Sequence, residues 1–191
     1  MKKIPTLFVR DPEDRSRVLD QITPGCEWVM AGEGRPTVKW DGTCVMLDEN
    51  GRWWARREVK PGKQPPPGYL VVQHDEVTGK TVGWEPVHQS PFEKYFVEAY
   101  DNSGGNTLTP GTYELVGPKI NSRSSYRPDY LPVHLLMQHG WTPLSARLEA
   151  GATPLTFTDL RELMRQWPYE GIVWHHPRGD MAKLKRCDFG F

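Results

Sequence analysis

The sequence has few cysteines, no excess charge of either sign and no long apolar run. Its three cysteines, Cys26, Cys44 and Cys187, are an odd number and lack Cys-x-x-Cys spacing, so neither a disulfide framework nor a zinc site is indicated. No apolar stretch is long enough to span a bilayer, and the start of the chain lacks the apolar segment of a signal peptide. These absences predict a cytoplasmic protein without a membrane partner.

Positive and negative charges balance, at 24 Lys and Arg against 24 Asp and Glu, so no global basic field points to nucleic acid. The basic residues are nevertheless grouped in three clusters: Arg52, Arg56, Arg57, Lys60 and Lys63; Lys119, Arg123 and Arg127; Lys183, Lys185 and Arg186. If the clusters converge in space, they form a groove for an anionic ligand, and otherwise they are solvated surface patches. The sequence leaves both interpretations open.

The hydrophobic pattern predicts an α+β fold built on antiparallel sheets with a few flanking helices. Strands are expected at residues 26–31, 36–41, 43–48, 52–59, 112–116, 171–175 and 181–186. The Asn50-Gly51 pair and residues 77–80 are typical of hairpin turns, and the Pro- and Gly-rich residues 60–68 are typical of a loop. Helices are expected at residues 11–21, 92–101 and 156–167.

The most informative segment is Lys39-Trp40-Asp41-Gly42. A lysine, one spacer and then Asp-Gly is how a covalent nucleotidyltransferase presents its nucleophile. Asp-Gly is also a common hairpin turn, so the segment alone leaves both interpretations open.

Three later segments supply partners for a lysine that attacks a phosphate. Strand alternation places Glu114 on the face opposite Tyr113 and Leu115, where it faces a site or pairs with a cross-strand lysine. Glu170 opens an apolar strand, either as a site carboxylate or as a loop residue. Lys183 and Lys185 share one strand face, either to hold a phosphate or to protect a sheet edge from aggregation.

In the order K-W-D-G, E-L-V-G, E-G-I-V and K-L-K, these segments resemble the motif set of ATP-dependent ligases and RNA-capping enzymes. The resemblance covers about residues 35–187. The run K-x-D-G-T-C followed by R-R-E-V-K-P-G is most similar to small RNA ligases that join a 5′-phosphate to a 3′-hydroxyl.

This resemblance implies a single nucleotidyltransferase domain over residues 1–191, of the ATP-grasp-like ligase adenylation type. DNA ligases and capping enzymes usually add an OB domain after the K-x-K motif, and we expect no C-terminal OB domain here, which counts against those two classes. It implies ATP as the AMP donor, Mg²⁺ or Mn²⁺ as cofactor, RNA ends as substrate and no obligate protein partner. The alternatives are a minimal DNA ligase, another nucleotidyltransferase of the superfamily, or a non-catalytic nucleic-acid-binding module with a decayed ligase fold.

The resemblance also implies roles for the catalytic segment. Lys39 would attack the α-phosphorus of ATP and carry AMP as a phosphoramidate. Lys183 and Lys185 would hold the α-phosphate region. Asp41 would organise the loop of the nucleophile, and Gly42 would let the backbone approach the nucleotide closely.

Further roles fall on residues outside that loop. Glu170 would bind the divalent ion directly or through water. Glu114 would hydrogen-bond the ribose hydroxyls. Arg57 would contact phosphate or the incoming 5′ end, unless it lies on a solvated hairpin face. Trp40 and Trp174 are candidates for stacking on a base, with core packing as the alternative.

Overall fold

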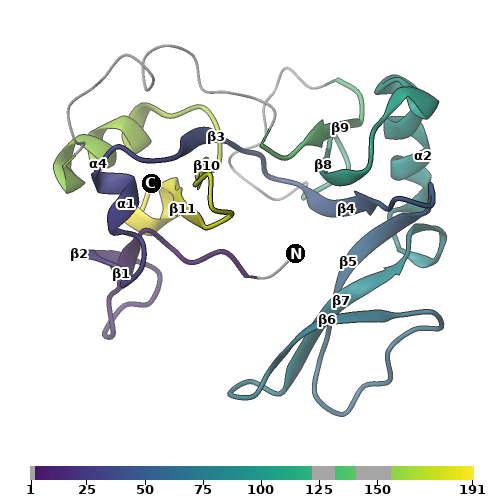
Figure 1. Ribbon diagram of the computed structural model, residues 1–191, viewed down its shortest axis with the longest axis horizontal. Coiled ribbons are helices and arrows are strands. Elements are labelled where there is room, and N and C mark those ends of the chain that lie inside the picture. The colour runs from purple at the N-terminus through teal and green to yellow at the C-terminus, as the bar shows by residue number, and fades with distance from the viewer. Residues whose placement is uncertain (1–2, 122–131, 141–155) are drawn as a thin grey trace. The chain divides into compact units, whose positions relative to one another are not determined.

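The computed structural model describes residues 3–121, 132–140 and 156–191, and the chain forms two units with separate cores (Figure 1). Unit 1 comprises Asp41–His139 together with Met1–Lys3, and unit 2 comprises Ile4–Trp40 and Gly140–Phe191. The expectation of one nucleotidyltransferase domain over residues 1–191 stays a prediction.

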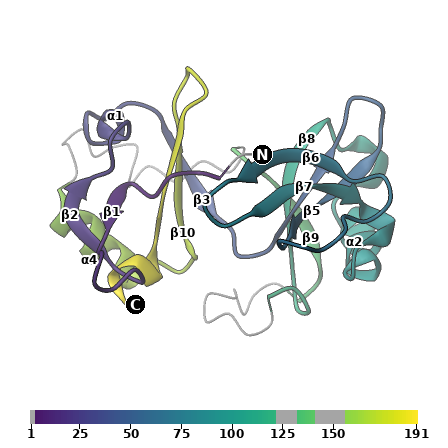
Figure 2. The ribbon, with the colours of Figure 1, turned by 90° about the horizontal axis from the view of Figure 1, so that it is seen from below.

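Unit 1 is built on a six-stranded antiparallel sheet in the order β6-β7-β5-β4-β8-β9. The strands are β4 (Thr43–Leu47), β5 (Trp53–Val59), β6 (Leu70–Asp75), β7 (Lys80–Pro86), β8 (Gly111–Val116) and β9 (Leu135–Gln138). The helix α2 (Glu93–Asn102) lies alongside β8 and β9 (Figure 2), and short 3-10 turns occupy Val87–Gln89 and Gly105–Thr107. This unit confirms the strands predicted at residues 43–48, 52–59 and 112–116 and the helix at residues 92–101.

Alternation along β8 sets which side chains enter the core of unit 1. Tyr113 and Leu115 are buried in the cluster that also holds Phe96 of α2, whereas Glu114 lies on the opposite face and is only partly buried. The β4–β5 turn forms as predicted, because Gly51 adopts a positive φ of 77° and the Asp48 carboxylate accepts hydrogen bonds from the turn amides.

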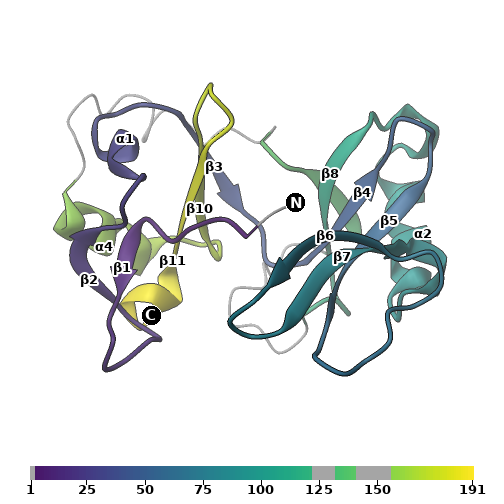
Figure 3. The ribbon, with the colours of Figure 1, turned by 60° about the horizontal axis from the view of Figure 1, so that its bottom comes forward.

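Unit 2 contains a three-stranded antiparallel sheet in the order β11-β10-β3 and a two-stranded sheet, β1-β2 (Figure 3). Its elements are β1 (Phe8–Arg10), β2 (Val18–Ile22), α1 (Glu27–Met30), β3 (Arg35–Lys39), α4 (Phe157–Gln166), β10 (Gly171–His175), β11 (Met181–Lys185) and a 3-10 turn at Arg186–Phe189. The strands and the helix predicted at residues 36–41, 156–167, 171–175 and 181–186 are confirmed. Thr156 and Asp159 form the capping box that begins α4.

One face of the three-stranded sheet is apolar and buried, and the other carries polar side chains. Ile172 and Leu184 are fully buried and pack with Leu160 and Met164 of α4 in the core of unit 2. The alternate positions of the same strands carry polar side chains, which therefore share the opposite face. Along the outer edge of β11, Lys183 accepts from the Leu7 amide and donates to the Pro5 carbonyl, at 2.7 and 3.0 Å.

Two predicted elements are wrong. Residues 11–21 do not form a helix, because the Asp11 carboxylate accepts from the amides of Glu13 and Asp14 in a local turn, and Val18–Ile22 pairs with β1. Residues 26–31 do not form a strand. They hold the one-turn helix α1, where the Trp28 indole donates to the Gly25 carbonyl at 3.0 Å.

The described residues thus form a mixed α/β structure with mostly antiparallel sheets and few helices, which is compatible with the α+β prediction. Across those residues, no helix combines the length and the apolar character needed to cross a membrane.

Candidate anion site and its neighbours

The polar face of the three-stranded sheet carries two lysines in one row. Lys39 of β3 and Lys185 of β11 are both in register with Gly171 of β10, which lies between them. A Cβ on Gly171 would come 2.0 Å from the Leu184 carbonyl oxygen and 2.9 Å from the Lys185 Cα. Glycine is therefore required at the centre of this row, because any side chain would collide with β11.

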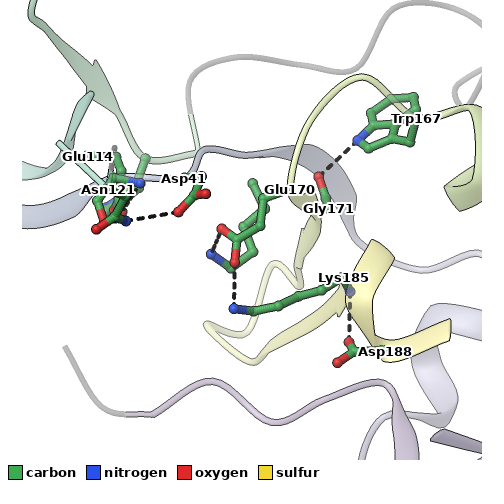
Figure 4. A network of polar contacts seen from close by, with 11 residues as sticks. Asp41, Glu114, Asn121, Trp167, Glu170, Gly171, Lys185 and Asp188 are labelled. Atoms are coloured by element: carbon green, nitrogen blue, oxygen red, sulfur yellow. Dashed lines mark hydrogen bonds and ion pairs between the residues drawn. The ribbon is translucent and has the colours of Figure 1, made fainter. Parts of the chain in front are cut away.

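Glu170, directly before β10, joins the two lysines. One of its oxygens, Oε2, ion-pairs with Lys39 Nζ, and the other, Oε1, lies 2.5 Å from Lys185 Nζ (Figure 4). The three side chains are largely buried, with exposed fractions of 20% for Lys39, 9% for Glu170 and 27% for Lys185. One carboxylate thus bridges two ammonium groups that the sequence places 146 positions apart. Charge-assisted hydrogen bonds of this kind fix both lysine side chains.

Lys183 occupies the next row of the same face, in register with Val173 of β10. Burial, together with the positive charges of Lys185 and Lys39, lowers the pKa of Lys183 from 10.5 to about 8. Burial would also lower the pKa of Lys185, but the charge and hydrogen bond of Glu170 offset burial and raise it. The fold therefore gathers three ammonium groups around one carboxylate, an excess of positive charge that favours a bound anion.

The 3-10 turn after β11 contains Asp188, which binds the backbone amide of Lys185. The Asp188 carboxylate, whose side chain is fully buried, accepts from the Lys185 amide at 2.8 Å and ion-pairs with Arg10 at 2.6 Å. Figure 4 shows this link from the Lys185 backbone to Asp188. The arrangement fixes the strand from which the Lys185 side chain reaches Glu170.

Aromatic side chains lie beside this face. Trp40, next to Lys39, makes an edge-to-face contact with Tyr169, next to Glu170, at 5.2 Å between ring centroids. Tyr169 in turn contacts Trp167, whose indole donates to the Gly171 carbonyl. Trp174 is 5% exposed within the core of unit 2 and packs there, which is the alternative named for it.

The alternative for Lys183 and Lys185, protection of a sheet edge, stays open, because β11 is an edge strand of the three-stranded sheet. On that edge the Lys183 backbone pairs with Pro5 and Leu7. Glu170 lies in the loop before β10, as its alternative states, but its side chain is 9% exposed and paired with two lysines.

A divalent ion fits this site only together with an anionic ligand. Both oxygens of Glu170 bind ammonium groups, and Asp188 is held by Arg10, so the site has more positive than negative charge. Mg²⁺ commonly takes one or two carboxylates, with phosphates and water completing its octahedron. Glu170 can supply one such ligand to a metal–nucleotide complex, and its metal role stays a prediction.

Asp41 and Gly42, the second half of the K-W-D-G segment, belong to unit 1. Asn121 donates to the Asp41 carboxylate at 2.9 Å and to the Gly42 carbonyl at 2.8 Å, and the Gly42 amide donates to Glu114 Oε1 at 3.1 Å (Figure 4). A Cβ on Gly42 would lie 2.2 Å from the Leu115 carbonyl oxygen. Gly42 is thus hydrogen-bonded to Glu114 of β8, and Asn121, which follows β8, binds both Asp41 and Gly42.

The hairpin interpretation of Asp41-Gly42 is wrong. The strands on either side, β3 and β4, belong to different sheets and do not pair with each other. Gly42 is absent from the glycines with positive φ, whereas a type I′ hairpin turn needs a positive φ there. Gly42 is instead required by the close approach of β8.

Glu114 and Arg57 both have protein partners in unit 1. Glu114 Oε2 lies 2.9 Å from His139 Nε2, and no cross-strand lysine pairs with it among the described contacts. Arg57 Nη1 lies 2.8 Å from Glu85 Oε2, and Glu85 is buried with 3% of its side chain exposed. Arg57 therefore neutralises a buried carboxylate while 43% of its own side chain stays exposed. The ribose role of Glu114 and the phosphate role of Arg57 stay predictions.

The three basic clusters are distributed over both units. The first, at residues 52–63, belongs to unit 1 and the third, at residues 183–186, to unit 2. Arg123 and Arg127 of the second cluster lie outside the described residues. A single groove lined by all three clusters stays a prediction.

Sequence reasoning missed Asp188, Arg10, Glu85 and His139 in these networks. Asp188 and Arg10 gave no signal, because their pairing joins segments 178 positions apart. His139 and Cys44 were not assigned a role, although Cys44 stands within the K-x-D-G-T-C motif.

No protein-family model matches this chain, and no curated protein matches it.

Proposed function

We propose that the protein is an ATP-dependent RNA ligase that works through a lysyl-AMP intermediate on a nucleotidyltransferase fold. The observation that carries this proposal is the bridge from Lys39 through Glu170 to Lys185, with Lys183 beside it on the same sheet face. These are the residues of three separate motifs in the resemblance, and they meet within unit 2.

In the first step, the neutral amine of Lys39 attacks the α-phosphorus of ATP. A nitrogen–phosphorus bond forms, the bond to the bridging oxygen breaks, and pyrophosphate leaves. Glu170 already accepts a hydrogen bond from Lys39 Nζ, so it is the carboxylate in place to take the proton from the amine.

In the following steps, AMP passes to the nucleic acid. A 5′-phosphate oxygen attacks the phosphorus of lysyl-AMP, and Lys39 leaves after its nitrogen takes up a proton. A 3′-hydroxyl then attacks the activated 5′-phosphate, the new phosphodiester bond forms, and AMP leaves.

Lys183 and Lys185 serve each step through charge. Negative charge develops on the non-bridging oxygens of the reacting phosphate, and fixed ammonium groups in a partly buried site stabilise that charge. Bound Mg²⁺ would neutralise further phosphate charge, with Glu170 as its protein ligand. Glu114, from the resemblance, is assigned to the ribose hydroxyls.

The test is autoadenylation followed by intact-mass measurement and peptide mapping. The protein incubated with ATP and Mg²⁺ is expected to gain one AMP on Lys39. Lys39→Arg keeps the positive charge but removes the nucleophile, and it should take up none. Lys94→Ala, at an exposed lysine of α2, is the matched control and should label like the wild type.

Other outcomes select the alternatives. Labelling by GTP in place of ATP would indicate a guanylyltransferase, and sealing of nicked DNA in preference to RNA would indicate a DNA ligase. If the wild type and Lys39→Arg take up equally little AMP but bind RNA, the protein is a non-catalytic nucleic-acid-binding module.

A further inference from the structure

Three side chains of unit 1 that can ligate a metal ion meet on one face of the six-stranded sheet. Cys44 of β4, Glu114 of β8 and His139, directly after β9, each offer one ligand atom, and these atoms all lie within 4.8 Å of one another. In the part of the chain that the structure describes, this is the one group of three such residues.

The strand register brings the three together. Cys44 and Glu114 are directly opposite each other in the β4–β8 pair. The His139 amide donates to the Thr112 carbonyl at 3.0 Å, which extends the β8–β9 ladder by one residue. Since Thr112 and Glu114 alternate with the buried Tyr113, the side chains project from the face opposite the core.

Neighbouring groups already orient two of the three ligands. His139 Nδ1 lies 3.0 Å from Thr112 Oγ1, and Glu114 Oε1 accepts from the Gly42 amide at 3.1 Å. Because the other nitrogen of His139 and the other oxygen of Glu114 have these partners, His139 Nε2 and Glu114 Oε2 are the atoms that face each other, 2.9 Å apart. Metal-binding histidines typically have their second ring nitrogen held in this way.

We propose that Cys44, Glu114 and His139 form a binding site for Zn²⁺, with a fourth position for water or another ligand. A thiolate, an imidazole and a carboxylate are a common ligand set for Zn²⁺, whereas Mg²⁺ prefers oxygen ligands alone. The side chains of Glu114 and His139 are 13% and 24% exposed, so the site is accessible to an ion but largely enclosed by protein atoms. The cysteine count gave no sign of this site, because only one cysteine takes part.

This metal site does not rest on the proposed ligase activity, although both would use Glu114. Zn²⁺ and the ribose role assigned to Glu114 would compete for one carboxylate, so metal binding is measured without nucleotide. Failure of autoadenylation would leave the metal site untouched, and failure of metal binding would leave the proposed activity untouched.

The experiment titrates the full chain with Co²⁺ as a spectroscopic probe and then displaces it with Zn²⁺. One Co²⁺ per chain should bind and produce the near-ultraviolet charge-transfer band of a cobalt–thiolate bond. Cys44→Ser should lose this band, and Cys187→Ser, at an exposed cysteine, should keep it. A large excess of Mg²⁺ should not displace the ion.

A second variant separates metal binding from folding. Thr112→Val preserves side-chain shape and removes only the hydroxyl beside His139, so it should keep the thiolate band but weaken Zn²⁺ affinity by about 10–100-fold. Absence of saturable Zn²⁺ binding to the wild type would overturn the proposal. A thiolate band that survives in Cys44→Ser, or Zn²⁺ affinity unchanged in Thr112→Val, would overturn it as well.

Discussion

The fold of unit 2 places Lys183 where burial and two neighbouring lysines disfavour its positive charge. Its ammonium group is partly buried on the same face as Lys39 and Lys185, and its pKa is lowered from 10.5 to about 8. Such an arrangement costs stability when the site holds no anion, and it becomes favourable when a phosphate lies between the lysines. A bound anion would therefore stabilise the fold through Lys183.

Replacing Lys183 by methionine should make the protein more stable at neutral pH. Between pH 8 and 10.5 the unfolded chain binds more protons at this residue than the folded chain, so wild-type stability rises with pH across that window. The advantage of Lys183→Met should be complete below pH 8 and vanish above pH 10.5.

Thermal unfolding of both proteins from pH 7 to pH 11, in a buffer without phosphate or sulfate, checks this. An advantage that stays constant over the whole range would contradict the lowered pKa. Addition of pyrophosphate should stabilise the wild type and not Lys183→Met.

Asp188→Asn should be among the more damaging changes in unit 2. The carboxylate is fully buried and holds Arg10 and the Lys185 amide, so its loss leaves Arg10 without a counter-charge. Because the Arg10 side chain is 34% exposed and stays partly solvated, the expected loss is about 1–3 kcal/mol, the usual cost of leaving a buried hydrogen-bonding group unsatisfied.

Denaturant unfolding gives this free energy directly. Asp14→Asn is the matched control, because the Asp14–Arg17 pair is about half exposed, with 51% and 55% of the two side chains accessible. Exposed pairs contribute about 0–1 kcal/mol, so equal losses in the two variants would refute the role assigned to Asp188.

At the scale of elements, α4 depends on its first turn. The Thr156 hydroxyl accepts from the Asp159 amide, and the Asp159 carboxylate accepts in return from the Thr156 amide. The Thr156 hydroxyl also donates to the Asp159 carboxylate at 2.6 Å, and this hydrogen bond, with that from the Thr156 amide, lowers the pKa of Asp159 below 3.8. The stabilisation by the ionised carboxylate is therefore complete above about pH 4 and is lost as pH falls through the lowered pKa.

Thr156→Ala should destabilise the protein by about 1 kcal/mol, the usual cost of removing a capping hydroxyl. Thr158→Ala is the control within the same helix, since Thr158 is exposed and alanine is the better helix former. Equilibrium unfolding should show a loss only for Thr156→Ala. Equal effects of the two changes would mean that the cap does not support α4.

Elements with strong local signals were predictable from the sequence. The Asn50-Gly51 turn, the capped helix α4 and the alternating strand β8 follow from short-range rules that the fold does not override. The wrong prediction at residues 11–21 has a tertiary cause, because Val18–Ile22 finds a partner in β1. The four-residue strand β9 was missed because it lacks both alternation and a turn signal.

The candidate site was predictable only in part. Period-two spacing placed Lys183 and Lys185 on one face, and the motif order linked them to Lys39 and Glu170. The doubly paired state of Glu170 could not be foreseen, because it depends on the register of β3, β10 and β11 across Gly171. The Arg57–Glu85 pair was hidden for the same reason, since the sequence does not fix which strand lies beside β5.

At the scale of the whole molecule, two separate cores predict two stability units. Leu160 is fully buried among residues of unit 2, and Leu160→Ala should cost about 2–5 kcal/mol through the cavity it leaves. Native-state hydrogen exchange should then become faster in β3, β10 and β11 and stay unchanged in β4, β5 and β8. Uniformly faster exchange in both units would show that they unfold together.

The pairing of Pro5 and Leu7 with the edge of β11 also has a practical consequence for handling the protein. Both hydrogen bonds lie on the outer edge of β11 and hold the backbone amide and carbonyl of Lys183, so displacement of Pro5 and Leu7 would disturb the anion site. A cut that removes Pro5 and Leu7 would break both hydrogen bonds to Lys183. The integrity of this segment should therefore be checked before activity is assayed.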